Sequence, residues 1–203
     1  LGFLEADNGV PIDAIVECTN TIAIAGRYCL AAIARRAHVI LMNAEVDLAL
    51  GQLLVHEAKK QGVIVTSDAG DQHGVLATMI DEIELWGFRI VQAGNMKGFL
   101  NRYGDAAGAR PWAEKQRLSV VQTVSYTDGT KMNVEQALIG NYAGLIPLLP
   151  GMQGPKISDL REVLDAFDFD QYGEQGRVDY TVGVPWPGGG VYVVGYCDDE
   201  LQK

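Results

Sequence analysis

The feature that most constrains the fold is an alternation, in the first third of the chain, between short apolar runs and longer segments with helical spacing. The apolar runs cover residues 12–18, 38–42 and 63–67, and the helical segments between them cover residues 22–36 and 47–61. Strands that are apolar almost throughout are typical of a parallel sheet covered on both faces. The sequence therefore predicts an α/β fold. The glycine at position 62 is expected to end the second helix.

Each of the three predicted strands is followed at once by polar residues. These are Thr19 and Asn20 after the first strand, Asn43 and Glu45 after the second, and residues 68–72 after the third. Because right-handed crossovers bring the carboxyl ends of parallel strands to one edge, where such folds bind ligands, these side chains are candidates for a binding site. Ordinary loop chemistry is the alternative, since Asn, Asp and Gly also favour turns and helix caps.

The chain has no GxGxxG and no Walker sequence. The glycine-rich dinucleotide turn belongs to the first strand of a Rossmann domain, so these strands are expected to be the later ones of such a sheet. The chain also opens on Leu1 without a start methionine and ends after a strand. We therefore expect an internal segment of a longer protein, with residues 1–70 as the C-terminal half of a Rossmann-like cofactor domain. Residues 71–203 would then form an α+β catalytic domain, itself truncated.

The patterns after residue 71 are weaker. They predict helices at 74–86, 131–142 and 158–166, and strands at 89–93, 178–184 and 190–196. Residues 94–101 indicate a glycine-bracketed loop, which could admit a substrate or be a plain surface turn, and residues 102–116 indicate an irregular loop. Residues 118–127 fit either a strand or the approach to a helix. Residues 185–189 predict a hairpin between the last two strands, with Trp186 at its tip either as a contact or as packing.

One helical segment carries alternating charges. Asp128, Lys131 and Glu135 are three, four or seven residues apart, which places them on roughly one helix face. A lysine flanked by carboxylates can carry or release a proton where an alcohol and a carbonyl interconvert. The alternative is a solvated charge ladder with no chemical role.

The charge of the chain limits its partners. Its 26 Asp and Glu residues against 16 Lys and Arg give a formal net charge of −10. A surface this acidic repels phosphate backbones and anionic membranes, so we expect neither nucleic-acid nor membrane binding. A small anionic ligand is still allowed, because a few lysines can outweigh the average field locally. Three cysteines without a CxxC pair favour a reducing cytoplasm, and the three histidines show no zinc-like spacing.

Several stretches, taken in order, resemble the homoserine-dehydrogenase-like NAD(P) oxidoreductases. The similarity is greatest to the branch described as deoxyxylulose-phosphate-reductoisomerase-like, whose longer members often carry a C-terminal SAF-type domain. The matching stretches are 13–20 (DAIVECTN), 39–47 (VILMNAEVD), 70–74 (GDQHG), 94–98 (GNMKG), 128–131 (DGTK), 178–184 (VDYTVGV) and 190–195 (GVYVVG). Two departures from homoserine dehydrogenases stand out. Lys97 stands where their substrate loop usually has Asn, and Asp128 and Lys131 are three residues apart where the usual spacing is four.

The resemblance implies a bidomain, homo-oligomeric enzyme that uses NADP or NAD, with a place in isoprenoid biosynthesis. It implies catalytic roles for Lys131, Asp128 and Lys97, with the extra lysine suited to a substrate phosphate. The substrate residues expected from it are Asn95, Asn101, Asp71, Gln72 and Thr130, and the cofactor residues are Thr19, Asn20, Asn43 and Glu45. If the substrate isomerises, a divalent metal is expected, with Asp68, Asp71, Asp128 and Glu135 as candidate ligands.

Three functions therefore remain open. The first is an NAD(P)-dependent oxidoreductase for a small hydroxylated, phosphorylated carbonyl compound. The second keeps the enzyme class but oxidises an alcohol as homoserine dehydrogenases do, without isomerisation. The third is a non-catalytic binding or assembly module that keeps the fold without the reaction, because the chain lacks a phosphate-binding turn.

Overall fold

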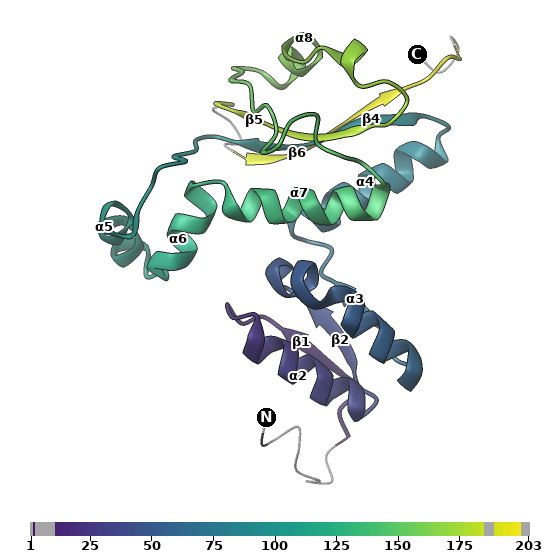
Figure 1. Ribbon diagram of the computed structural model, residues 1–203, viewed down its shortest axis with the longest axis vertical. Helices are drawn as coiled ribbons and strands as arrows, with labels where there is room; N and C mark the ends of the chain where they lie inside the picture. Colours follow the sequence, from purple (N-terminus) through teal and green to yellow (C-terminus); the bar gives the residue numbers. More distant parts are fainter. Residues whose placement is uncertain (1, 3–10, 185–188, 200–203) are drawn as a thin grey trace. The chain divides into compact units, whose positions relative to one another are not determined.

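The computed structural model describes residues 2, 11–184 and 189–199. The chain divides into two compact units, Leu1–Asp71 and Gln72–Lys203. Figure 1 shows the elements of both units, and each unit is described below by itself. The functional identities assigned to the two halves of the sequence stay predictions.

The first unit is built on a parallel three-stranded sheet. Its elements are β1 (Ala14–Glu17), α2 (Ala23–Ala34), β2 (His38–Leu41), α3 (Ala44–Gln61) and β3 (Val65–Ser67). The strands lie in the order β1-β2-β3, with Glu17 paired to Leu41 and Leu41 paired to Ser67. The predicted α/β fold with a parallel sheet is therefore confirmed, and the carboxyl ends of the three strands lie at one edge.

The helix α3 begins and ends where its sequence predicts. The Asn43 side chain accepts a hydrogen bond from the Val46 amide at 3.3 Å, which satisfies one of the first-turn N–H groups. Lysines 59 and 60 occupy the last turn, where they favourably meet the negative end of the helix dipole. Gly62 ends the helix at a φ of 71°, so the predicted glycine cap is confirmed.

The second unit contains a mixed sheet with helices on one face and a short helical segment on the other. Its elements are α4 (Gln72–Leu85), β4 (Arg89–Lys97), α5 (Ala106–Gln116), α6 (Val120–Thr127), α7 (Thr130–Ala143), the 3₁₀ turn η1 (Leu160–Glu162), α8 (Val163–Ala166), the 3₁₀ turn η2 (Phe169–Gln171), β5 (Arg177–Val182) and β6 (Gly189–Tyr196). The central strand β4 pairs in parallel with β5 and antiparallel with β6. The helices α4 and α7 pack against this sheet, while α8 lies on its other side (Figure 1).

The central strand is longer than the sequence predicts. The strand β4 continues through Lys97, so the prediction of a loop over residues 94–101 is wrong for its first four residues. The glycine at position 94 suggested a loop, but the structure places it within a strand, where only a residue without a side chain fits. A Cβ atom at this position would lie 2.0 Å from the Cζ atom of Tyr192 on the neighbouring strand β6. Asn95 and Lys97 therefore stand on a rigid strand.

The segment after β4 is helical. Residues 102–116 were predicted to be irregular, but α5 begins after Asp105, whose side chain accepts a hydrogen bond from the Gly108 amide at 2.7 Å. The helix contains Pro111, which has no N–H to donate within it. Residues 118–127, which the sequence left open, form the helix α6. Figure 1 shows α5 and α6 as an arm to one side of the sheet in the second unit.

The predicted hairpin between the last two strands is wrong. The strands β5 and β6 lie on opposite sides of β4, because both pair with it along its length. Residues 185–188, and with them Trp186, lie outside the described residues, so the predicted contact role of Trp186 is not addressed.

A buried amide links two buried tyrosines across this sheet. Gln92 donates to the Tyr172 hydroxyl at 2.8 Å and accepts from the Tyr192 hydroxyl at 3.1 Å. Burial raises the pKa of both phenols above the ordinary value of 10.0. The folded state therefore holds these protons more tightly than the unfolded state. The stability that this provides is complete below pH 10 and is lost as the pH rises further.

We expect Tyr192→Phe to lower the free energy of unfolding by about 1–3 kcal/mol at neutral pH, because it leaves the Gln92 carbonyl buried without its donor. The variant should also lose stability less steeply above pH 10. Urea denaturation at pH 7 and at alkaline pH measures both effects. A Tyr192→Phe protein as stable as the parent at pH 7 would show that this hydrogen bond contributes nothing.

Candidate functional site

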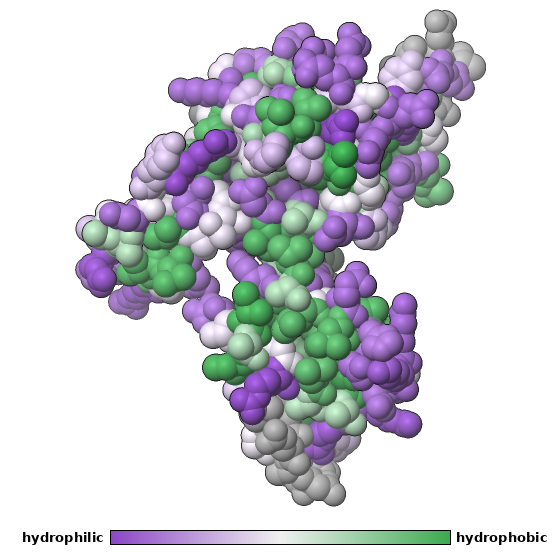
Figure 2. Space-filling view, in the orientation of Figure 1, coloured by the Kyte–Doolittle hydropathy of each residue, from purple (hydrophilic) through white to green (hydrophobic). Residues whose placement is uncertain are grey.

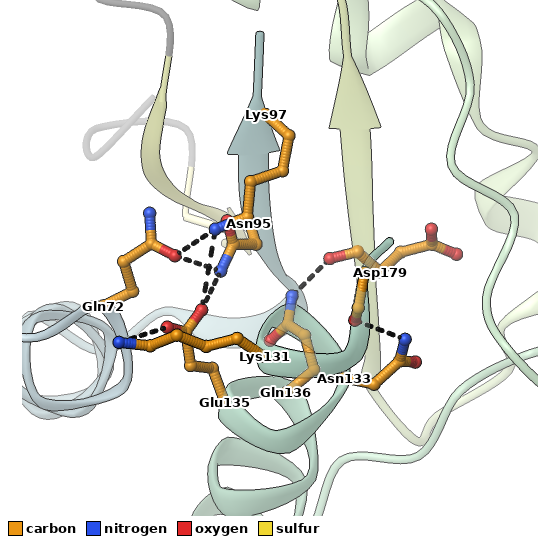
Figure 3. Close-up of polar contacts among 9 residues, drawn as sticks. Gln72, Asn95, Lys97, Lys131, Asn133, Glu135, Gln136 and Asp179 are labelled. Atoms are coloured by element: carbon orange, nitrogen blue, oxygen red, sulfur yellow. Dashed lines mark hydrogen bonds and ion pairs between the residues drawn. The ribbon is translucent and has the colours of Figure 1, made fainter. Parts of the chain in front are cut away.

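Polar side chains from three elements of the second unit meet at the carboxyl end of β4. Gln72 opens α4, Asn95 and Lys97 stand on β4, and Lys131 and Glu135 stand on α7 (Figure 3). Asn95 and Lys97 share a face because they are two residues apart on a strand. Lys131 and Glu135 share a face because they are four residues apart on a helix. We call these five residues the lysine cluster.

The contacts within the lysine cluster are short and specific. The Gln72 Oε1 atom accepts from Lys97 Nζ at 2.6 Å and from Asn95 Nδ2 at 2.7 Å. The same Asn95 nitrogen donates to Glu135 Oε2 at 3.0 Å, so both of its protons are used. Glu135 Oε2 also lies 3.7 Å from Lys97 Nζ, and Glu135 Oε1 lies 3.9 Å from Lys131 Nζ.

The lysine cluster places two ammonium groups beside one buried carboxylate. Glu135 is only 1% exposed, and a buried carboxylate is costly unless charges or donors compensate it. Lys97 and Lys131 contribute to that compensation, with 17% and 34% of their side chains exposed. Because both lysines keep part of their surface in water, an anion can reach them from solvent.

The sequence pointed to Glu135 as a member of the charge ladder and as a metal candidate, but not as the carboxylate shared by both lysines. The i,i+4 spacing from Lys131 was the available signal. Its proximity to Lys97 depends on how α7 packs on the sheet, which no local pattern reveals.

Other predicted residues of the second unit make local turn contacts. Asp128 ends α6, and its Oδ1 atom accepts from the Thr130 amide at 2.8 Å, at the start of α7. Thr130 itself is exposed. Asn101 is also exposed, and its Oδ1 atom accepts from the Tyr103 amide at 3.3 Å. The catalytic role of Asp128 and the substrate roles of Thr130 and Asn101 stay predictions.

The cofactor residues predicted in the first unit lie at the carboxyl edge of its parallel sheet. Asn43 donates to the backbone carbonyls of Thr19 and Thr21 at 2.9 and 3.0 Å, which ties the loop after β1 to the start of α3. Thr19 and Asn20 are exposed, and Glu45 is half-buried in the first turn of α3. Exposed polar groups at this edge fit the usual position of a dinucleotide in α/β folds. Their cofactor roles stay predictions.

The carboxylates predicted as metal ligands already have protein partners. Glu135 faces two lysines, Asp128 accepts from Thr130, and the Asp68 side chain accepts from the amides of Gly70 and Asp71 at 3.1 and 3.0 Å. Within residues 11–184 and 189–199, no three His, Cys, Asp or Glu side chains form a group that could hold a metal ion.

A cavity of about 840 Å³ adjoins the lysine cluster in the second unit. Gln72 and Lys97 line it on the side of the cluster, and Asn101 lies along its wall. Its remaining wall comes largely from the loop after β4 and from the helices α5 and α6. The sequence did not predict this wall, because it gave no helix to residues 102–116.

Behind the cluster, a buried carboxylate holds a loop in place. Asp179 on β5 accepts from the Gln153 amide at 3.1 Å and from the Gly154 amide at 3.0 Å, and its carbonyl accepts a hydrogen bond from the Gln136 side chain on α7 (Figure 3). Burial raises the pKa of the Asp179 carboxyl above its ordinary value of 3.8, and the amides offset only part of this.

We expect Asp179→Asn to reduce the pH dependence of stability. Because the pKa of Asp179 is raised in the folded state, its contribution is complete below pH 3.8 and is lost as the pH rises above that value. The amide keeps the Oδ1 acceptor but cannot ionise, so the variant should gain stability relative to the parent as the pH rises from about 4 to 7. Urea denaturation across this range tests the sign, and a parallel pH dependence in both proteins would contradict it.

No helix in the described part of the chain combines the length and the apolar character that a membrane span requires. Comparison with curated proteins gives no match. Among solved structures, the chain is similar to a protein from Archaeoglobus fulgidus provisionally described as a homoserine dehydrogenase. The identity is 19% and the TM-score 0.43, over 70% of this chain and 46% of that one.

It is also similar to a protein from Thermotoga maritima provisionally described as a dehydrogenase. Here the identity is 12% and the TM-score 0.44, over 96% of this chain and 59% of that one. The chain thus spans about half the length of these two proteins. A family model described as "Oxidoreductase DRL, catalytic domain" matches residues 70–203, which is more than half of the chain. The chain therefore belongs to the oxidoreductase DRL family, because that family's catalytic-domain model matches it over residues 70–203.

Proposed function

We propose that this chain is the catalytic part of an NADP- or NAD-dependent oxidoreductase that interconverts a carbonyl and an alcohol on a small hydroxylated, phosphorylated compound. The single observation that carries this proposal is the pair of ammonium groups held on one buried carboxylate at the end of β4. The family match supports the reaction class. The deoxyxylulose-phosphate-reductoisomerase-like substrate is the finer part of the proposal.

Lys97 would hold the anionic part of the substrate. Its ammonium group is fixed on a strand by Gln72 and Glu135, so little side-chain freedom is lost when an anion binds. Gln72 adds an amide group that lines the cavity next to it, and this amide can exchange hydrogen bonds with substrate hydroxyls, while the buried Asn95 holds Gln72 in place. This geometry favours a phosphate over homoserine, because a phosphate carries more negative charge than a carboxylate and homoserine also carries an ammonium group that the lysines would repel.

Lys131 would move the proton. It is the more exposed of the two lysines, so its ammonium group can reach a bound carbonyl oxygen. In the reducing direction Lys131 donates a proton to that oxygen as the carbonyl carbon receives a hydride, and in the oxidising direction it takes the proton back. Glu135 keeps both lysines charged and oriented. NADPH, when bound, supplies the hydride, and Thr19, Asn20, Asn43 and Glu45 of the first unit are the residues proposed to hold it.

The test uses the native, full-length gene product and follows NADPH absorbance with deoxyxylulose phosphate, and with homoserine and NADP in the oxidising direction. We expect turnover with deoxyxylulose phosphate, a loss of about 10²-fold or more in kcat for Lys131→Met, and an increase mainly in KM for Lys97→Met. Unchanged kinetics in both variants would remove the catalytic assignment. Turnover with homoserine alone would favour the second function, and no binding of NADPH would favour the assembly module.

A further inference from the structure

The cavity beside the lysine cluster is larger and more apolar than a small sugar phosphate needs. Its volume of about 840 Å³ lies near the upper end of the roughly 300–1,000 Å³ range of pockets for drug-sized ligands. Only one side of it, at Gln72 and Lys97, belongs to the lysine cluster. The rest of the wall has no role in the reaction proposed above.

Aromatic side chains form the far wall. Phe99 follows β4, Trp112 stands on α5 and Tyr126 stands on α6, and all three line the cavity. The Trp112 and Tyr126 rings meet edge to face, with centroids 6.1 Å apart and planes at 76°. This contact fixes the orientation of the indole ring, as an aromatic binding wall requires.

These side chains are only partly covered by the protein. Phe99 is 64% exposed and Trp112 is 46% exposed, although both line a cavity. Figure 2 shows further hydrophobic side chains on the arm of α5 and α6, where Leu118 and Val121 are exposed. Large apolar groups that stay exposed around a concavity are typical of a ligand-binding site, because ligand binding removes their surface from water.

The charged side chains of the lining lie on opposite sides of the cavity. Asp105 lies at the start of α5, where its carboxylate accepts from the Gly108 amide and caps the helix. Lys97 lies on the side of the lysine cluster and is the cationic side chain among the lining residues, so an anionic group of a ligand is expected at that side. A ligand that satisfies both sides must carry an anion at one end and an apolar group at the other.

We infer that the substrate is an anionic hydroxy-carbonyl compound with an aromatic or branched apolar extension, which lies between Phe99, Trp112 and Tyr126. This inference rests on the proposed function, because it assumes that Lys97 holds the anion. It adds an apolar extension to the hydroxylated, phosphorylated compound of the proposed function, and deoxyxylulose phosphate then represents the reacting part of that substrate. The aromatic residues are specificity determinants that bind the extension and take no part in the proton transfer.

The test compares two probes that differ only in an apolar group. Methyl phosphate and phenyl phosphate are titrated into the native full-length protein by calorimetry. We expect phenyl phosphate to bind at least about tenfold tighter, since its ring would bury apolar surface against the wall. The ratio of the affinities for phenyl phosphate and methyl phosphate should fall to about one in Trp112→Ala and in Phe99→Ala. The preference should persist in Trp86→Ala, the matched control, because Trp86 is 61% exposed but does not line the cavity.

A ratio of the two affinities near one in the unaltered protein, or no measurable binding of phenyl phosphate, would overturn the inference. A preference that persists in both Trp112→Ala and Phe99→Ala would also overturn it. Lys97→Met separates this inference from the proposed function. This variant should bind both probes more weakly by the same factor, so the ratio of the two affinities should not change. Unaltered affinities in Lys97→Met would refute the anion site but would not contradict binding at the aromatic wall.

Discussion

Glu135→Gln should lower kcat by about 100-fold while the protein stays folded. The carboxylate lies within 4 Å of both lysine nitrogens and is almost fully buried, so it is the group that allows two ammonium ions to stand at one site. Glutamine keeps the shape and can still accept from Asn95, but it removes the negative charge. The two lysines would then repel each other, and one of them would lose its proton more readily.

A change in pH profile distinguishes this role from a merely structural one. The pH above which kcat declines should be lower in Glu135→Gln than in the parent. Glu135→Asp should restore part of the activity. The matched control is Glu57→Gln, because Glu57 forms an exposed ion pair with Lys60 at 2.7 Å in the first unit. That variant should keep full turnover. Equal losses in Glu57→Gln and Glu135→Gln would show that the effect is not specific to the lysine cluster.

Gly154→Ala should be strongly destabilising, with a loss of about 3 kcal/mol or more in the free energy of unfolding. Two costs add at this position. Its φ of 60° lies in the left-handed region, which a residue with a Cβ atom adopts only with strain. The new Cβ would also lie 2.1 Å from the Cζ atom of the buried Tyr180 ring, so the ring or the loop must move.

Gly151→Ala separates these two costs. Gly151 has a φ of 81°, but nothing lies within 4 Å of the position of its Cβ. In this control only the backbone strain lowers the free energy of unfolding, by about 1–2 kcal/mol. Urea denaturation of both variants measures the difference. Equal losses in the two proteins would mean that the Tyr180 ring yields without cost and would contradict the packing argument.

The parts of the fold that follow from local sequence were predictable. The strands β1 to β3 are nearly continuous apolar runs, and α3 has a cap residue at one end and a glycine at the other. In contrast, the last residues of β4 could not be recognised locally. Asn95 is suited to a buried strand only because Gln72 and Glu135, 23 and 40 residues away in the sequence, accept its two protons.

The strand order of the second sheet could not be recognised from the local sequence either. Adjacent strands in the sequence predict a hairpin, but β4 lies between β5 and β6 and pairs with both. Gly94 marks where Tyr192 of β6 crosses close to β4, yet a glycine in a sequence does not say which side chain needs the space.

Within the site, the spacing of Lys131 and Glu135 was visible as an i,i+4 pair. The approach of Lys97 to Glu135 was not, because it depends on the packing of α7 against the sheet. The aromatic wall was missed altogether, since the polar residues of 102–116 suggested an irregular loop in place of the helix α5. The sequence could therefore indicate the chemistry of the site but not the size of its ligand.

The most direct test is the kcat of the double variant Lys131→Met/Glu135→Gln compared with the two single variants, in the native full-length protein with deoxyxylulose phosphate and NADPH. If Lys131 and Glu135 work as one unit, removing the second residue should cost little more than removing the first, so the double variant should match the slower single variant. Losses that multiply would mean that Lys131 and Glu135 act independently, which would contradict a shared reaction site at the end of β4.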